Sequence, residues 1–98
     1  MSATQLSTRG VLRSGRLTGL GLTAGERLVL IVLIDHADAD GITFPAERTI
    51  ANESGMQRSG VQKQLPALVR NGVIRVVQEG GPRSSTRYQI APQLWTTG

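Results

Sequence analysis

Two stretches of this 98-residue sequence concentrate side chains that donate hydrogen bonds or carry positive charge. They span residues 57–63 and residues 79–87. Such side chains bind phosphates through charge and contact the edges of nucleic-acid bases through hydrogen bonds. Catalysis is the weaker interpretation, because the chain has no cysteine, one histidine and no recognisable phosphate-binding glycine loop. The candidate contact residues are Gln57, Arg58, Ser59, Gln62, Lys63, Arg83, Ser84, Ser85 and Arg87.

Positive charge is unevenly distributed along the chain, whose formal net charge is +4. Residues 24–56 hold six acidic residues and two arginines, whereas residues 57–98 hold six cationic residues and one acid. This concentration around the candidate residues favours a polyanion partner, and double-stranded DNA is the natural one. The alternative is a solvated basic face that binds no ligand.

The first candidate stretch begins the second of two helices predicted within residues 45–72. The apolar residues Val61, Leu65 and Leu68 recur at four- and three-residue steps, which places them on one face of that helix. A tight turn is predicted at residues 54–56, where Gly55 can adopt a positive φ. Residues 57–63 therefore lie where a helix-turn-helix carries its reading helix.

The reading helix is predicted to run from about Gln57 to the pair Asn71-Gly72, which is typical of a helix end. Pro66 lies inside this span, where proline removes a backbone hydrogen bond at a cost of ~3 kcal/mol. We expect either a kink at Pro66 or an end of the regular helix near Leu65.

A further helix is predicted over residues 24–39, before the helix pair. Thr23 and Glu26 match the capping-box pattern, and Asp40-Gly41 supplies a stop. The apolar run 28–34 would otherwise suggest a buried strand. A helix that is apolar nearly all round is either covered on several sides or leaves one face for a partner subunit.

The second candidate stretch is predicted to form a hairpin. Residues 73–78 and 86–90 read as strands, joined by a flexible, basic and hydroxyl-rich loop at residues 79–85. A hairpin in this place is a wing that can contact the sugar-phosphate backbone, although an ordinary surface hairpin has the same composition. Residues 42–44 are predicted to be extended, with Phe44 anchored in the core.

The remaining segments carry fewer signals. Residues 1–21 are predicted to be a flexible basic arm, or to dock on the domain at residues 22–98 through apolar residues such as Val11. His36 has too few suitable neighbours to predict a metal site. The longest apolar run has seven residues, too few to cross a membrane, and no signal peptide is evident, so no membrane partner is expected. No cofactor or small-molecule substrate is expected either. The absence of cysteine fits the cytoplasm.

The order of these predicted elements resembles that of winged helix-turn-helix domains, which are mainly helical with a small β-hairpin (three helices plus a wing). The resemblance is to domains of phage and plasmid replication proteins and mobile-element regulators, and more distantly to GntR-type repressors. It covers about residues 22–90, although Gly60 and Pro66 depart from the family pattern. It rests on residues 22–27, Asp40-Gly41, Phe44-Pro45, Ile50-Ala51, Gly55-Met56, Val61, Leu65, Leu68, residues 71–74 and Arg87-Tyr88.

The resemblance implies sequence-specific binding of double-stranded DNA, with the helix at about 57–71 in the major groove and the wing at 79–85 on the backbone. The protein would act as a small transcriptional regulator or as a replication or recombination accessory. The small contact area of one such domain favours a homodimer on a two-fold site. The alternative is a winged helix used for protein contact, suggested by the apolar first helix and by Trp95.

Overall fold

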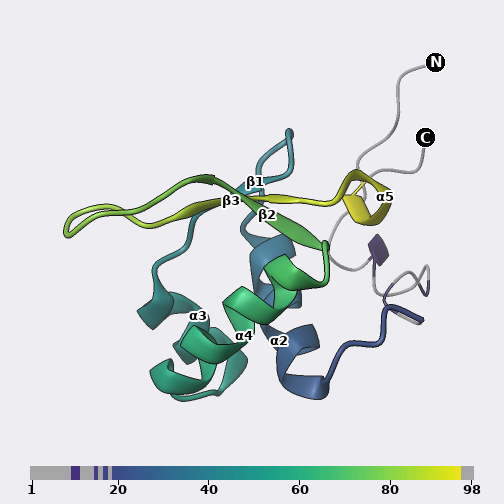
Figure 1. Cartoon of the computed structure of the whole chain (residues 1–98), viewed down its shortest axis with the longest axis horizontal. Coiled ribbons are helices and arrows are strands. Elements are labelled where there is room, and N and C mark those ends of the chain that lie inside the picture. Colours follow the sequence, from purple (N-terminus) through teal and green to yellow (C-terminus); the bar gives the residue numbers. More distant parts are fainter. Residues whose placement is uncertain (1–9, 12–14, 16, 18, 96–98) are drawn as a thin grey trace.

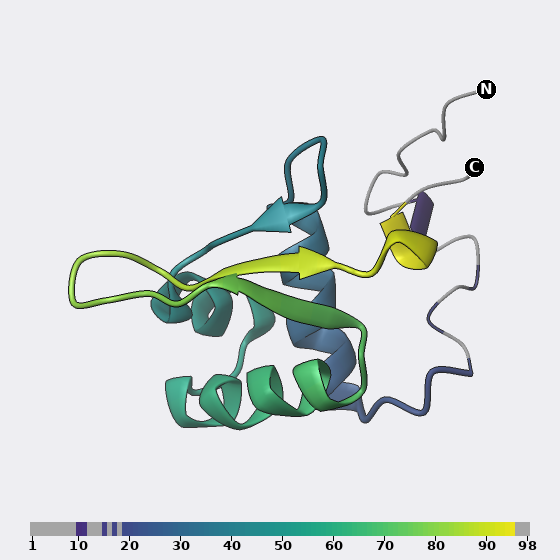
Figure 2. The same ribbon diagram turned by 45° about the horizontal axis from the view of Figure 1, so that its top comes forward.

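A computed structural model of the chain describes residues 10–11, 15, 17 and 19–95. In this part of the chain, helices α2, α3 and α4 lie on one side of a small antiparallel sheet with the strand order β1-β3-β2 (Figures 1 and 2). The β2–β3 hairpin extends away from the body, and α5 lies at the opposite end of the sheet (Figure 1). The elements are α2 Ala24–Asp35, β1 Ile42–Thr43, α3 Glu47–Ser54, α4 Arg58–Arg70, β2 Ile74–Gln78, β3 Arg87–Ile90 and α5 Pro92–Trp95.

Helix α2 begins at the predicted capping box. The hydroxyl oxygen of Thr23 accepts a hydrogen bond from the amide of Glu26 at 3.2 Å, and Oε1 of Glu26 accepts one from the amide of Thr23 at 3.0 Å. The second carboxylate oxygen of Glu26 accepts a hydrogen bond from Nδ2 of Asn71 at 2.8 Å. Glu26 is buried. It therefore joins the start of α2 to the end of α4 as well as capping its own helix.

These contacts make folding stability depend on the protonation of Glu26. The hydrogen bonds from Thr23, first from its amide and then from its hydroxyl, hold the pKa of Glu26 below its ordinary value of 4.5. A pKa lowered by folding gives a contribution that is complete above the unfolded-state pKa and is lost as the pH falls through the folded-state pKa. We expect Glu26→Gln to lower the free energy of unfolding at pH 7 and to flatten its decline below about pH 4.5.

Urea denaturation of both proteins at a series of pH values measures this effect. Glu79→Gln is the matched control, because it neutralises an exposed acid that lies outside the capping box. An acid-side decline that is as steep in Glu26→Gln as in the unmodified chain would contradict the assignment.

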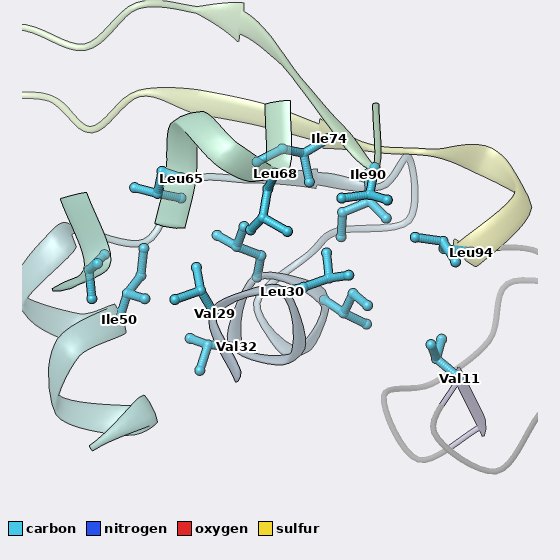
Figure 3. Close-up of a cluster of buried hydrophobic side chains, with 14 residues drawn as sticks. Val11, Val29, Leu30, Val32, Ile50, Leu65, Leu68, Ile74, Ile90 and Leu94 are labelled. Carbon is cyan, nitrogen blue, oxygen red and sulfur yellow. The ribbon is translucent and has the colours of Figure 1, made fainter. Parts of the chain in front are cut away.

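Helix α2 lies at the centre of the core. This is the first of the two predicted arrangements, in which the helix is covered on several sides. Val29, Leu30 and Leu33 are fully buried, whereas Leu28 on the same helix is 44% exposed. The core extends past the end of the sheet, where Leu94 of α5 and Val11 are both buried (Figure 3). Val11 belongs to the predicted basic arm, most of which lies outside the described residues. The buried apolar residues are Val11, Val29, Leu30, Val32, Leu33, Ile34, Ile50, Val61, Leu65, Leu68, Val73, Ile74, Ile90 and Leu94.

The predicted end of the first helix was wrong, because α2 stops at Asp35 and not near residue 39. The carboxylate of Asp38 accepts hydrogen bonds from the amides of Asp40 and Ile42 at 2.9 and 3.0 Å. An aspartate that bonds to amides ahead of it in the chain supplies a turn that competes with the helix. No helix in the described ranges combines the length and hydrophobicity needed to cross a membrane.

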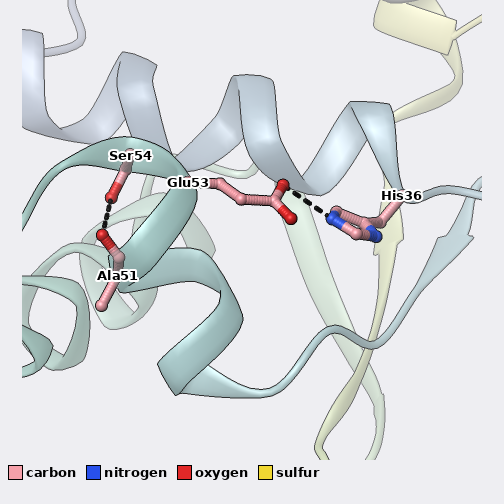
Figure 4. A network of polar contacts seen from close by, with 4 residues as sticks. All are labelled: His36, Ala51, Glu53 and Ser54. Carbon is pink, nitrogen blue, oxygen red and sulfur yellow. Dashed lines mark hydrogen bonds and ion pairs between the residues drawn. The ribbon is translucent and has the colours of Figure 1, made fainter.

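The turn between α3 and α4 forms as predicted. Gly55 is the C-cap of α3 with φ of 75°, in the left-handed region that favours glycine. Just before it, the hydroxyl of Ser54 donates to the carbonyl of Ala51 at 3.4 Å (Figure 4). On the same helix, Glu53 contacts Nε2 of His36 at 2.8 Å, which ties α3 to the end of α2 (Figure 4). Gly55 therefore ends α3, while the Glu53–His36 contact holds α3 against the end of α2.

Helix α4 continues through Pro66 to Arg70, so it does not end near Leu65. Its buried residues are the predicted stripe of Val61, Leu65 and Leu68. Asn71 caps the helix, and Gly72 follows with φ of 74°. Packing of this stripe against α2 and α3 offsets the hydrogen bond that proline removes.

The prediction that Phe44 anchors the core was also wrong, since this residue is 46% exposed. Thr43 pairs with Tyr88 across β1 and β3, and it is Thr43 that is fully buried. Successive residues of an extended chain face opposite sides, so Phe44 faces outward. There the guanidinium carbon of Arg87 lies 4.3 Å from the centre of the Phe44 ring. This contact covers part of the ring outside the core.

Candidate nucleic-acid interface

The start of α4 presents five of the predicted contact residues to solvent. Gln57 is its N-cap and makes no side-chain capping bond, so its amide group is available for other partners. The apolar stripe faces the core, and the remaining positions of the first two turns therefore face outward. The exposed residues are Gln57, Arg58, Ser59, Gln62 and Lys63.

The tip of the β2–β3 hairpin is closed by a short turn. The amide of Gly81 donates to the carbonyl of Ser84 at 3.1 Å, and the amide of Ser84 donates to the carbonyl of Gly81 at 3.3 Å. The hydroxyl oxygen of Ser84 also accepts from the amide of Gly81 at 3.2 Å. Arg83 lies within this turn and is exposed, while Ser85 is partly buried. The hairpin thus carries one cation at its far end.

A cleft of about 460 Å³ separates this hairpin from the helices. Arg58 lines it from α4, and Arg83, Ser84 and Ser85 line it from the hairpin. Cationic and hydroxyl side chains from two separate elements therefore face one hollow. Donors of these kinds are suited to the oxygens of a phosphate backbone. The predicted residues that do not line this cleft are the N-cap Gln57, Ser59, Gln62 and Lys63 of α4, and Arg87 of β3.

Glu47, the first residue of α3, also faces α4 and was not among the predicted contact residues. Its Oε1 accepts a hydrogen bond from Nε of Arg58 at 3.3 Å and another from Nε2 of Gln62 at 3.1 Å. Glu47 lines both the first cleft and a neighbouring one of about 440 Å³, which Gln62 also lines. No local pattern could reveal these contacts, because they join residues 11 and 15 positions apart across the turn.

Tyr88 of β3 forms part of the wall shared by the two clefts. Burial raises the pKa of Tyr88 above 10.0, and the negative charges of Glu47 and Glu79 raise it further, against a smaller opposing effect of its hydrogen bond with Thr86. The phenol therefore stays protonated at neutral pH. It presents a neutral hydroxyl group, and no negative charge, to whatever enters the clefts.

Arg87 lies apart from the other predicted contact residues. It directly precedes Tyr88 on β3, so its side chain faces the opposite side of the sheet from Tyr88 and the clefts. There it stacks on Phe44. Gln89, two residues along, faces the same outer side and accepts from Nε of Arg75 at 2.9 Å. Arg87 is thus engaged on the outer face, away from the group formed by α4 and the hairpin tip.

The side chains of Asp35, His36 and Glu53 could each offer one ligand atom within 4.8 Å of the others. All three are exposed. We interpret the His36–Glu53 contact as a tie between α2 and α3, since exposed acidic groups commonly lie together without a metal. The side chain of Trp95, suggested above as a partner contact, lies outside the described part of the structure.

The comparisons with known proteins bear on the whole arrangement. A family model described as a helix-turn-helix domain matches residues 20–74, which include α2, β1, α3, α4 and the first residue of β2. Comparison with curated proteins gives no match. The chain is similar to a solved structure titled "The crystal structure of transcriptional regulator PA3341", with a TM-score of 0.56 and 25% sequence identity. The similarity covers 88% of this chain and 61% of that one, so this chain spans about three-fifths of that protein's length.

Proposed function

Because this chain belongs to the helix-turn-helix domain family, whose members bind DNA, we propose that it is a sequence-specific reader of double-stranded DNA. Helix α4, within residues 57–71, would enter the major groove, and the wing at residues 79–85 would contact the sugar-phosphate backbone. The protein would act as a small transcriptional regulator or as a replication or recombination accessory of a phage or plasmid. It would work with the DNA of a bacterial or phage-infected cell, in the cytoplasm.

The observation that carries this proposal is the cleft between α4 and the wing. Arg58 on one wall and Arg83 to Ser85 on the other supply donors to a strand of phosphates passing between them. A strand held there would bring the exposed face of α4 against the base edges of the adjacent groove. The likeness to a solved transcriptional regulator, whose fold covers most of this chain, supports the regulatory role.

The test has two steps. Binding to random-sequence duplex is first titrated against salt, because phosphate contacts make the affinity fall steeply as salt rises. Preferred sites are then selected from a random pool. A steep slope with an enriched motif is expected, and inverted symmetry in the motif would support the proposed homodimer. Absence of binding at ~50 mM salt, where non-specific phosphate contacts should hold, would overturn the proposal.

Two substitutions separate base reading from phosphate contact. Lys63→Ala is expected to relax specificity by about 1–3 kcal/mol at one position of the site, as for loss of a side-chain contact to a base. Arg83→Ala is expected to weaken binding to all sequences alike and to lower the salt slope by about one. Both are measured by titration against the selected site and against scrambled duplex.

Arg75→Ala is the matched control for these substitutions. It also removes one positive charge, but Arg75 bonds to Gln89 on the outer side of the sheet. It should leave the specificity unchanged and the salt slope nearly so. Equal losses on all sequences for both Lys63→Ala and Arg83→Ala would contradict the proposed division of roles.

A protein-contact function is the second candidate, and the fold weakens one of its supports. Most of the apolar residues of α2 are buried within the domain, so that helix does not offer a broad apolar face. What favours this candidate is a smaller set of exposed apolar side chains, which comprises Leu28, Phe44, Val76 and Val77. Retention on a protein partner without salt-dependent affinity for DNA would favour it.

A further inference from the structure

We propose that Glu47 determines which base Gln62 reads, acting through a hydrogen bond and without touching DNA itself. This inference rests on the proposed function, because it assumes that α4 meets base edges. Glu47 would then be a positioning residue that belongs to α3, the helix that precedes the reader.

The geometry places one carboxylate against two side chains of the reading face. Oε1 of Glu47 lies 3.1 Å from Nε2 of Gln62 and 3.3 Å from Nε of Arg58. The Glu47 side chain is 36% exposed, compared with 64% for that of Arg58, so the acid is the less accessible partner of this pair. Glu47 is the first residue of α3, a position where the helix dipole favours a negative charge.

A carboxylate only accepts hydrogen bonds, and this property fixes the orientation of the Gln62 amide. The NH₂ group of Gln62 must face Glu47, because its carbonyl oxygen would be repelled there. One hydrogen of the NH₂ group is then occupied. The end of Gln62 is left with one acceptor, the carbonyl oxygen, and one remaining N–H donor.

That pair of groups matches adenine and not guanine. Adenine presents a donor at N6 and an acceptor at N7 in the major groove, whereas guanine presents acceptors at both O6 and N7. Guanine would require two donors from Gln62, and Glu47 already holds one of them. A held Gln62 therefore prefers adenine, while a Gln62 released from Glu47 can turn both N–H groups toward guanine.

The same carboxylate restrains non-specific binding. It pairs with Arg58 and lines the cleft in which we place the phosphate strand. An acid in this place repels phosphate and competes for the arginine, so it weakens contacts that carry no sequence information. Glu47 should thus raise specificity by both effects, through orientation of Gln62 and through reduced affinity for any backbone.

The test compares Glu47→Gln with the matched control Glu79→Gln. Glu79→Gln removes the same charge from the base of the wing, whereas the hydrogen bonds of Arg58 and Gln62 described above go to Glu47. Sites are selected from a random pool with each protein, and affinities are then measured on duplexes that differ by adenine or guanine at each enriched adenine. Glu47→Gln is expected to reduce the preference for adenine at one position by about fivefold or more and to strengthen binding to scrambled duplex. Glu79→Gln should keep the preference.

Gln62→Ala and the double variant Glu47→Gln/Gln62→Ala complete a double-mutant cycle. If Glu47 acts through Gln62, its substitution has no further effect on base preference once Gln62 is absent. The inference would be overturned if Glu47→Gln kept the preference for adenine, or if Glu79→Gln lost as much of that preference. Either result would leave the proposed DNA binding intact. Failure of the unmodified chain to bind DNA would instead overturn the proposed function, so the two failures are distinguishable.

Discussion

Replacing Leu30 with alanine is expected to lower the free energy of unfolding by about 2–5 kcal/mol, the range for removing a large apolar side chain from a packed core. Leu30 is fully buried in the middle of α2, the helix that α3 and α4 both contact. Its removal leaves a cavity between elements that other contacts hold apart. Small domains have modest total stability, so a loss of this size removes a large fraction of it.

Leu28→Ala is the matched control for this prediction. It makes the same chemical change two residues away on the same helix, but at a side chain that is 44% exposed. We expect it to change stability by less than about 1 kcal/mol. Urea denaturation with linear extrapolation measures both variants. Comparable losses for Leu28→Ala and Leu30→Ala would show that α2 is not buried on the face described above.

Replacing Pro66 with alanine is expected to raise the free energy of unfolding by about 2 kcal/mol. Pro66 lies inside α4, has no N–H group and leaves the carbonyl of Gln62 without its usual partner four residues ahead. Alanine restores that bond and relieves the clash of the ring, which is worth ~3 kcal/mol in a helix interior. The greater freedom of the unfolded chain without proline offsets about 0.4–1 kcal/mol of this gain. The side chain of Pro66 is exposed, so little packing is lost.

Pro66→Gly separates two contributions to the free energy of unfolding, that of the restored hydrogen bond and that of helix propensity. Glycine also restores the N–H group but is about 1 kcal/mol less favourable than alanine in a helix. Thermal and urea denaturation should therefore rank the proteins as alanine variant, glycine variant and unmodified chain, from most to least stable. A Pro66→Ala protein no more stable than the unmodified chain would mean that the surrounding packing requires the proline.

Features that depend on a few neighbouring residues were predictable from the sequence. The capping box of Thr23 and Glu26 uses two residues three apart, and the structure has both of its bonds. The stripe of Val61, Leu65 and Leu68 follows from helical period alone. Gly55 was recognised as a turn residue because few other residues adopt its φ. These signals were sufficient for the order of the elements and for the exposed face of α4.

Features that depend on distant partners were not predictable. Whether Thr43 or Phe44 faces the core is decided by the pairing of β1 with β3, and apolar character alone favoured the wrong residue. The early end of α2 is an exception, because the bonds of Asp38 are local and the prediction followed the later stop signal Asp40-Gly41 instead. The contacts of Glu47 depend on the angle between α3 and α4. The candidate site was thus predicted as a set of donors, without the acid that accepts hydrogen bonds from two of them.

The strand order has a consequence for how firmly the wing is held. Near Tyr88 and Gln89, β3 pairs with β1 on one side and with β2 on the other. Beyond Gln78 and Arg87, two contacts join the arms of the hairpin. They are the Gly81–Ser84 bridge and the hydrogen bond from the amide of Gly80 to the hydroxyl of Thr86. A segment with exposed backbone bonds and few apolar contacts opens locally, at a lower free energy than global unfolding. The wing is therefore a separate unit of local opening, whose amides exchange with solvent while those at the centre of β3 stay protected. Such a unit can change its shape without loosening the packing of α2, α3 and α4.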